Sequence, residues 1–195
     1  MATLFTDLFD TPVIPGLSSG EDIVDREEEA DLIARIDAEA LSPFRFQGWL
    51  GKRVTRSFGW HYDFDGGALA EGEPLPKWLL PLRRRAASFA DLGEDTLEQA
   101  LLIRYDPGAG IGWHRDRPVF GHVVGISLGA EATMRFRRRR PDGFLRTSAP
   151  LAQRSIYHMA GEVRHEWEHS IAEMDETRWS VTFRSLANGA VPDGR

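Results

Sequence analysis

The spacing of apolar residues in the first half of the chain is typical of helices. The segment DREEEADLIARIDAEA has apolar side chains at helical intervals, and Asp25 with Glu28 three residues later forms a capping box that predicts where this helix begins. A second helix is predicted over PKWLLPLRRRAASFA, with Pro76 near its start and Pro81 bending it. N-terminal helices are therefore expected within residues 1–96.

After about Leu97 the pattern changes to short apolar runs separated by residues that favour turns. The runs are ALLIRY, HVVGISL, ATMRFRR, RSIYHMA, VRHEWEHSI and RWSVTFRSL, and pieces such as DPGAG and RRPDG lie between them. Short strands with Gly, Pro and Asp between them indicate a β-sandwich or barrel. The prediction is a single, mostly β domain of the α+β class, with its all-β core over residues 97–187 and a flexible tail over residues 188–195.

Length and composition fit this single domain. The chain has 195 residues, of which 42% are apolar and 28% charged, and no apolar run approaches the length of a membrane span. The acidic start MATLFTDLFDTP has no basic region, so a secretory or transit peptide is not expected. The absence of cysteine leaves histidine and carboxylate as the available metal ligands and agrees with a cytoplasmic location. We further expect a monomer.

The charge of the chain is distributed unevenly. Its net value of −6 weighs against indiscriminate binding to nucleic acids. Basic residues nevertheless cluster in RRR at Arg83–Arg85 and in MRFRRRR at Met134–Arg140. Such runs are ordinarily a solvated helix face and the end of a hairpin. The alternative for the second run is a contact with phosphate groups.

Two potential metal ligands follow a glycine-rich turn in RYDPGAGIGWHRD. In a strand, residues i and i+2 share one face, so His114 and Asp116 are expected to project together. Most such pairs are surface polar residues, and a ferrous site needs a third protein ligand. The segment VRHEWEHSI offers His165 and His169, which share strand parity but lie about 13 Å apart along an extended strand. Only one of them can complete the site, and the spacing does not decide which.

The last predicted strand, RWSVTFRSL, separates two kinds of side chain by face. One face is apolar and packs into protein. The opposite face carries two arginines and two hydroxyl groups: Arg178, Ser180, Thr182 and Arg184. On the protein surface these would form an ordinary exposed strand face. Inside a barrel, two desolvated guanidinium groups would need an anion, such as a small dicarboxylate that chelates a metal at one end and meets arginine at the other.

Several of these segments together resemble the AlkB family of iron(II)- and 2-oxoglutarate-dependent dioxygenases. In chain order they are RYDPGAGIGWHRD, FGHVVGISLG, MRF, SIYHMAGEVRHEWEHSI and RWSVTFR. The resemblance extends from about VIPGL to Leu186 and is strongest after Leu101. It implies a double-stranded β-helix (jelly roll), in agreement with the strand pattern. It also implies that the protein uses Fe(II), 2-oxoglutarate and dioxygen.

The resemblance also implies roles for individual residues. The implied iron ligands are His114, Asp116 and His169, the last because WEHSI matches the third-ligand segment of the family. The residues implied for 2-oxoglutarate are Tyr105, Arg178, Ser180 and Arg184. Arg178 is expected at the distal carboxylate of the cosubstrate, and Arg184 nearer the end that chelates the metal.

Two positions depart from the pattern of the family. Ile103 stands where an Asn usually contacts the cosubstrate, so one polar contact is expected to be lost. Pro118 stands two residues after Asp116, where some members have an acidic residue. The entrance to the substrate pocket is therefore expected to differ.

The substrate implied by the resemblance is an N-alkylated base in single- or double-stranded DNA or RNA. Oxidative demethylation of this kind repairs DNA damage and releases formaldehyde. The alternatives are the same chemistry on a protein side chain or small molecule, which the acidic net charge favours, and a non-catalytic binding module. The candidate substrate lid is GKRVTRSFGWHYDF, with Arg53 and Arg56 for phosphates and Trp60 and Tyr62 for stacking on a base. The other interpretation places Trp60 in the core.

Overall fold

The two predicted helices are present in the computed structural model, which describes residues 14–46, 49–62 and 69–187. Helix α1 spans Arg26–Ala38, and the Asp25 carboxylate accepts a hydrogen bond of 2.8 Å from the backbone N–H of Glu28, as the capping box predicted. Helix α2 spans Leu80–Phe89 and follows the 3₁₀ turn η1, Lys77–Leu79. Pro81 lies in the first turn of α2, where its missing N–H needs no partner, so the prediction that it bends the helix was wrong.

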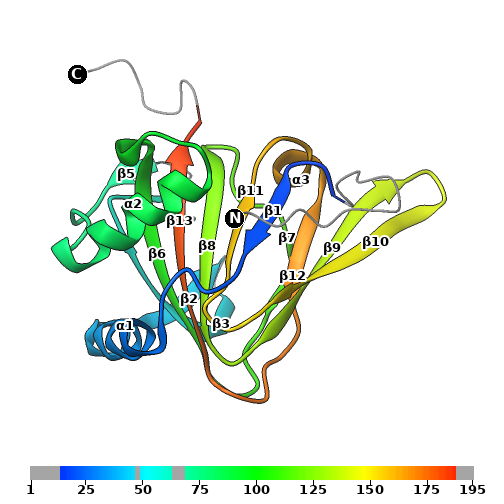
Figure 1. Ribbon diagram of the computed structural model, residues 1–195. Helices are drawn as coiled ribbons and strands as arrows, with labels where there is room; N and C mark the ends of the chain where they lie inside the picture. The colour runs from blue at the N-terminus through cyan, green and yellow to red at the C-terminus, as the bar shows by residue number, and fades with distance from the viewer. Residues whose placement is uncertain (1–13, 47–48, 63–68, 188–195) are drawn as a thin grey trace.

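Two antiparallel sheets form the body of the protein (Figure 1). The larger has seven strands in the spatial order β1 (Leu17–Gly20), β11 (Ile156–Met159), β8 (Phe120–Gly129), β13 (Arg178–Leu186), β6 (Leu97–Tyr105), β3 (Trp49–Phe58) and β2 (Ser42–Phe46). The smaller has four, in the order β10 (Gly143–Leu151), β9 (Ala132–Arg140), β12 (Glu168–Ile171) and β7 (Ile111–His114). A separate pair joins β4 (Trp60–Tyr62) to β5 (Leu69–Glu71), and η2 (Glu94–Thr96) is a further 3₁₀ turn.

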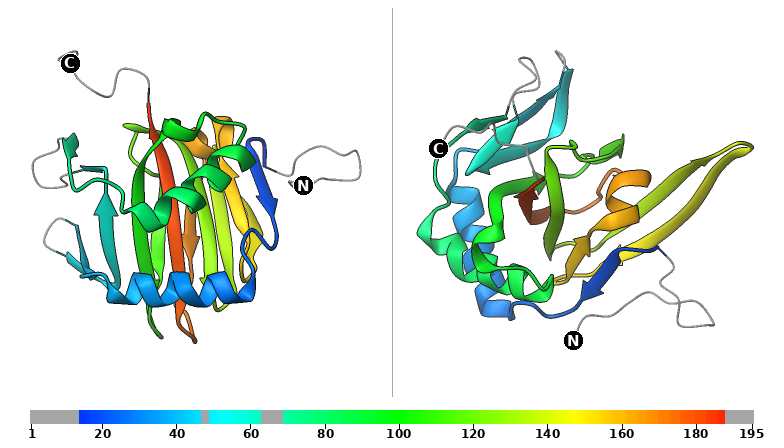
Figure 2. Two further views of the ribbon diagram at one scale, coloured as in Figure 1. Left: turned by 60° about the vertical axis from the view of Figure 1, so that its left-hand side comes forward. Right: turned by 90° about the horizontal axis from the view of Figure 1, so that it is seen from above.

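The two sheets confirm the predicted mostly β jelly-roll core. The N-terminal half of the chain contributes further strands to the larger sheet. Strands β1, β2 and β3 come from the first 96 residues and extend the larger sheet at both edges. Figure 2 shows α1 and α2 lying across one face of this sheet, while the hairpin β9–β10 projects beyond the body of the molecule. No helix in the described part of the chain is long and apolar enough to cross a membrane.

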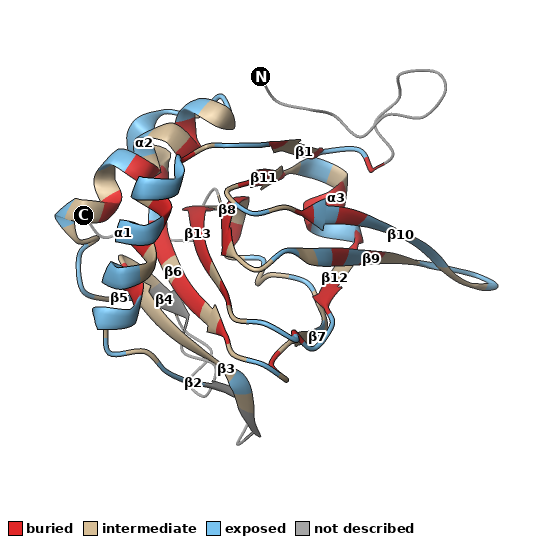
Figure 3. Cartoon of the chain, turned by 60° about the horizontal axis from the view of Figure 1, so that its bottom comes forward, coloured by how far each residue is buried: buried red, intermediate tan, exposed pale blue. Residues whose placement is uncertain are grey.

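The core has two parts, one on each face of the larger sheet. The first joins α1 and α2 to that sheet and includes Leu32, Leu82 and Phe183. The second includes Tyr105 and Phe136, and lies between the two sheets. In Figure 3 the buried residues accordingly follow β6, β8 and β13.

Strand β13 alternates between these two parts, as its sequence predicted. Val181 and Phe183 pack in the first cluster, beneath the helices. Arg178 and Arg184 are also buried, but they contact Tyr105 and Phe120 on the opposite face. The arginines therefore line the interior of the sandwich rather than an exposed surface.

The segment VRHEWEHSI is not one continuous strand. Residues Gly161–Glu166 form the short helix α3, and only Glu168–Ile171 form a strand, β12. Trp167 lies between them, and its indole N–H donates a 3.0 Å hydrogen bond to the Glu162 carboxylate, which closes the turn. The prediction that His165 and His169 share strand parity was therefore wrong, because His165 belongs to the helix.

Candidate metal centre

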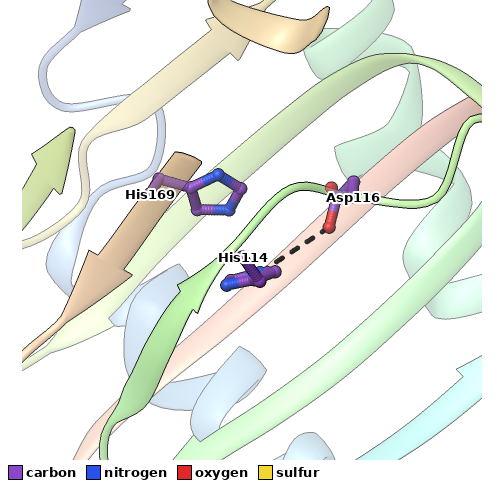
Figure 4. Close-up of side chains that lie close together, drawn as sticks. All are labelled: His114, Asp116 and His169. Atoms are coloured by element: carbon purple, nitrogen blue, oxygen red, sulfur yellow. Dashed lines mark ion pairs between the residues drawn. The ribbon is translucent and has the colours of Figure 1, made fainter. Parts of the chain in front are cut away.

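Three side chains from two segments meet at one end of the smaller sheet. His114 is the last residue of β7, and His169 in β12 lies directly opposite it in the ladder. Their ring centroids are 4.2 Å apart. Asp116 lies two residues beyond the end of β7, with its Oδ1 3.9 Å from Nε2 of His114 (Figure 4). One ligand atom from each of the three residues lies within 4.8 Å of the others, the arrangement that a shared metal ion requires.

The structure places His169, and not His165, at this site. The side chain of His165 is exposed on α3, and its backbone carbonyl accepts a hydrogen bond of 3.1 Å from Arg115. Among the described residues, His114, Asp116 and His169 form the one cluster with metal-ligand spacing. The choice that sequence spacing left open is thus made by the pairing of β12 with β7.

The protonation states at this centre suit a divalent metal. Burial lowers the pKa of His114, and it lowers that of His169 to about 3, so both imidazoles are neutral and keep a lone pair. Burial alone would raise the pKa of Asp116, but the Arg184 guanidinium lowers it well below its usual range through its charge and its hydrogen bond. Two neutral nitrogens and one ionised oxygen form the donor set that ferrous iron takes in facial-triad sites. The residues therefore fit this ion.

Arg184 holds the carboxylate of the metal centre. Its Nε donates to Oδ2 of Asp116 at 3.1 Å, and its Nη1 donates to Oε1 of Gln99 at 2.9 Å. Sequence analysis did not identify Gln99, although its inward position follows from its pairing with Arg184 across β6 and β13. Arg184 therefore lies near the metal end of the cavity, where the resemblance placed it.

Arg178 has a buried nitrogen with nothing to bond to. Its side chain is 1% exposed, its Nε donates to Oγ of Ser127 at 3.0 Å, and its Cζ lies 5.3 Å from the Tyr105 ring centroid. Its Nη1 has no hydrogen-bond partner among the described residues. A buried, unpaired guanidinium nitrogen is costly, so this end of the cavity suits an anion. Ser180 is buried two residues along β13 on the same face.

The residues predicted for the substrate lid lie in different surroundings. Burial lowers the pKa of Arg53, and Tyr105, Arg184 and Asp116 also influence it, so its guanidinium lies near these residues. Arg56 lies instead in ion pairs with Glu39 at 3.3 Å and Glu73 at 2.7 Å. These two ion pairs neutralise the guanidinium of Arg56, which was expected to contact phosphates.

The aromatic residues of the predicted lid belong to β4. Trp60 is half-buried and belongs to neither core cluster. Tyr62 ends the same strand, and its side chain lies outside the described residues. Trp60 is therefore not part of either core cluster, and its contact with a base stays a prediction.

Comparisons with known proteins agree with the fold and the donor set. The tRNA (carboxymethyluridine(34)-5-O)-methyltransferase ALKBH8 of Macaca fascicularis is 33% identical over 168 residues, which are 80% of this chain but 24% of that protein. This chain thus spans about a quarter of the length of that relative. The human alpha-ketoglutarate-dependent dioxygenase alkB homolog 4 is 28% identical over 218 residues, 93% of this chain and 70% of the homolog.

One solved structure and one superfamily sequence pattern also match this chain. The structure of OsALKBH1 superposes with a TM-score of 0.68 at 14% identity, over 90% of this chain and 99% of that one, which shows a shared fold. The sequence pattern of the 2OG-Fe(II) oxygenase superfamily matches residues 45–186. The chain belongs to the 2OG-Fe(II) oxygenase superfamily, as an AlkB-like member.

Proposed function

We propose that this protein is an iron(II)- and 2-oxoglutarate-dependent dioxygenase that removes alkyl groups from the bases of DNA or RNA by oxidation. His114, Asp116 and His169 would hold the iron, which with 2-oxoglutarate and dioxygen supplies the oxidising power when bound. Arg184 fixes the Asp116 carboxylate in its ionised, ligating form. Arg178, with Tyr105 and Ser180 beside it, would bind the far carboxylate of the cosubstrate.

A basic pocket that includes Arg115 supports the nucleic-acid part of this proposal. The pocket has a volume of about 540 Å³ and is lined by Arg115, Arg138, Arg139, Arg140, Pro141, His165 and Glu166. We call it the hairpin pocket, because β9 supplies three of its arginines. Arg115 stands between His114 and Asp116 in the chain, so one residue of the pocket belongs to the segment that carries two of the metal ligands.

The arginines of the hairpin pocket are only partly neutralised. Arg138 pairs with Glu162 at 2.7 Å and with Glu166 at 3.1 Å. Within the described residues, Arg115, Arg139 and Arg140 form no ion pair. Exposed, unpaired guanidinium groups on one surface suit a phosphate backbone. The tRNA in the name of the macaque relative agrees with such a substrate.

The experiment that tests this proposal combines turnover with binding. The protein is incubated with iron(II), 2-oxoglutarate and oligonucleotides that carry N-methyl or etheno groups, and loss of mass on the base is measured. The double variant Arg139→Glu/Arg140→Glu should bind a single-stranded oligonucleotide at least about 10-fold more weakly, with a shallower salt dependence, because each phosphate contact contributes about 0.7 to the logarithmic slope. The control is Arg83→Glu/Arg84→Glu on α2, which changes charge equally at a distance from the pocket.

Two results would contradict the nucleic-acid assignment. One is binding that does not depend on salt, with no loss of mass on any base. The other is equal weakening by both double variants, which would indicate a general effect of charge. Consumption of 2-oxoglutarate without any change to a base would favour the alternative substrate, a protein side chain or small molecule, which the net charge of −6 supports.

A further inference from the structure

Tyr157 of β11 belongs to the core cluster between the two sheets, together with Tyr105. Its register partner in β8 is Gly125, and the partner of Gly125 in β13 is Thr182. A Cβ atom on Gly125 would lie 2.2 Å from Cζ and 2.3 Å from the hydroxyl oxygen of Tyr157. The far end of the phenol ring therefore lies directly over Gly125, and this position must be glycine for the ring to reach past β8 towards β13.

The phenol of Tyr157 lies close to the charged and polar side chains between the two sheets. The charged and polar groups that act on it are, from strongest to weakest, those of Arg178, Tyr105, Asp116 and Arg184. Burial raises the pKa of Tyr157 to about 12, so the phenol keeps its proton and serves as a hydrogen-bond donor near neutral pH.

Three donors at this end of the cavity are without acceptors. In the part of the chain that the structure describes, neither the hydroxyl of Tyr157 nor that of Tyr105 forms a hydrogen bond, and Nη1 of Arg178 has no partner either. Ile103, two residues before Tyr105 and buried against the same interior, offers no polar group. A carboxylate has two oxygens and about four acceptor positions, so one carboxylate can satisfy all three donors.

We propose that Tyr157 is a cosubstrate-binding residue, whose hydroxyl donates to the metal-distal carboxylate of 2-oxoglutarate beside Arg178 and Tyr105. This inference rests on the proposed binding of the cosubstrate by Arg178, but not on the identity of the nucleic-acid substrate. It gives the cavity a polar contact on the side opposite Ile103. Gly125 has a defined part in it, because its missing side chain is what lets the ring reach the carboxylate.

The test is the variant Tyr157→Phe, which removes the hydroxyl and keeps the ring. Binding is measured without oxygen, with Mn(II) in place of iron, for 2-oxoglutarate and for oxalate, which chelates a metal but has no distal carboxylate. We expect 2-oxoglutarate to bind about 10-fold more weakly, the loss of one hydrogen bond to a charged group, and oxalate to bind as in the wild type. The KM for 2-oxoglutarate should rise with little change in kcat. Gly125→Ala should weaken 2-oxoglutarate binding similarly, and adding Tyr157→Phe to it should weaken binding no further.

Matched variants separate the possible failures. Ser155→Ala removes another buried hydroxyl, one that donates to the carbonyl of Ala152 outside the cavity, and should leave cosubstrate binding unchanged. If Arg178→Gln weakens 2-oxoglutarate binding and Tyr157→Phe does not, the assignment of Tyr157 is wrong while that of Arg178 stands. If neither variant weakens it, the cosubstrate does not bind at this end. Equal loss of oxalate and 2-oxoglutarate in Tyr157→Phe would indicate an effect on the metal and would also overturn the proposal.

Discussion

Arg164 on α3 holds the segment that carries the metal ligand Asp116, and its removal tests how the centre is positioned. The side chain is 4% exposed. Its guanidinium donates to four backbone carbonyls: Gly121 at 3.0 Å, Asp116 at 3.1 Å, and Arg117 and Phe120 at 2.5 Å each. Asp116 and Arg117 belong to the loop between β7 and β8, and Phe120 and Gly121 are the first two residues of β8. The buried guanidinium of Arg164 thus supplies hydrogen bonds that this segment would otherwise obtain from a neighbouring strand.

The size of the effect follows from this burial. Arg164→Ala leaves four carbonyls without their donor, and the loss of a buried, hydrogen-bonded charge network costs about 3–5 kcal/mol. For a chain of this length, each kcal/mol lowers the Tm by roughly 2–4 °C, so a fall of roughly 6–20 °C is expected. Arg164→Lys should recover only part of it, because a single ammonium group cannot reach four carbonyls in the geometry of a guanidinium.

The assay must separate stability from positioning. Thermal unfolding gives the first, and titration of the apoprotein with Mn(II) at a temperature well below the Tm gives the second. We expect the metal affinity of Arg164→Lys to fall about 10-fold even where the protein is folded, the order of effect known for residues that support metal ligands. The control Arg84→Ala breaks an exposed ion pair with Glu94, and should change the Tm by no more than a few degrees and the metal affinity not at all. Wild-type Tm and metal affinity in both Arg164 variants would refute the reasoning.

Two further predictions concern the histidines. His169→Ala should abolish binding of Mn(II) and turnover of 2-oxoglutarate, whereas His165→Ala should retain both. Metal titration measures the binding, and succinate release measures the turnover. The reverse pattern would exclude His169 from the metal centre. Burial lowers the pKa of His158 to about 4 and that of His169 to about 3, from an ordinary 6.5, so the unfolded chain binds more protons below pH 6.5. The free energy of unfolding of the apoprotein should therefore be highest above pH 6.5 and decline as the pH falls toward the pKa values of His158 and His169. The decline should be less steep in His158→Gln. A Tm that is constant between pH 7 and 4.5 would contradict the lowered pKa values.

Local sequence signals predicted the parts of the fold that depend on neighbours in the chain. The cap at Asp25 and the alternation of β13 both follow from the spacing of a few residues, and both are present. The structure of VRHEWEHSI does not follow from strand parity, because α3 forms a helical turn that includes Glu162, Arg164 and Glu166 before the strand begins. The position of His169 opposite His114 arises from a ladder between strands more than fifty residues apart. No local pattern contains that pairing.

Single polar residues within apolar strands were the hardest to interpret. Gln99 and Tyr157 lie in runs that predict buried strands, and nothing in their spacing shows which face of the strand meets the cavity. Arg53 and Arg56 show the same difficulty within β3. They are three positions apart, so they lie on opposite faces: Arg53 lies near Tyr105 and Asp116, while Arg56 pairs with Glu39 and Glu73. Both residues were assigned to phosphate contacts because charge alone does not show orientation.

The balance of charge in the cavity gives a physical reason for a cosubstrate with two acidic ends. Arg184 is neutralised by Asp116, but Arg178, six residues away on β13, has only a neutral hydroxyl and an aromatic ring as partners among the described residues. A desolvated cation in that position costs several kcal/mol unless a ligand brings an anion to it. A ligand that only chelated the metal would leave Arg178 unpaired, and one that bound only Arg178 would leave the metal face open. A dicarboxylate satisfies both ends, so we expect this interior to bind a molecule such as 2-oxoglutarate in preference to a monocarboxylate.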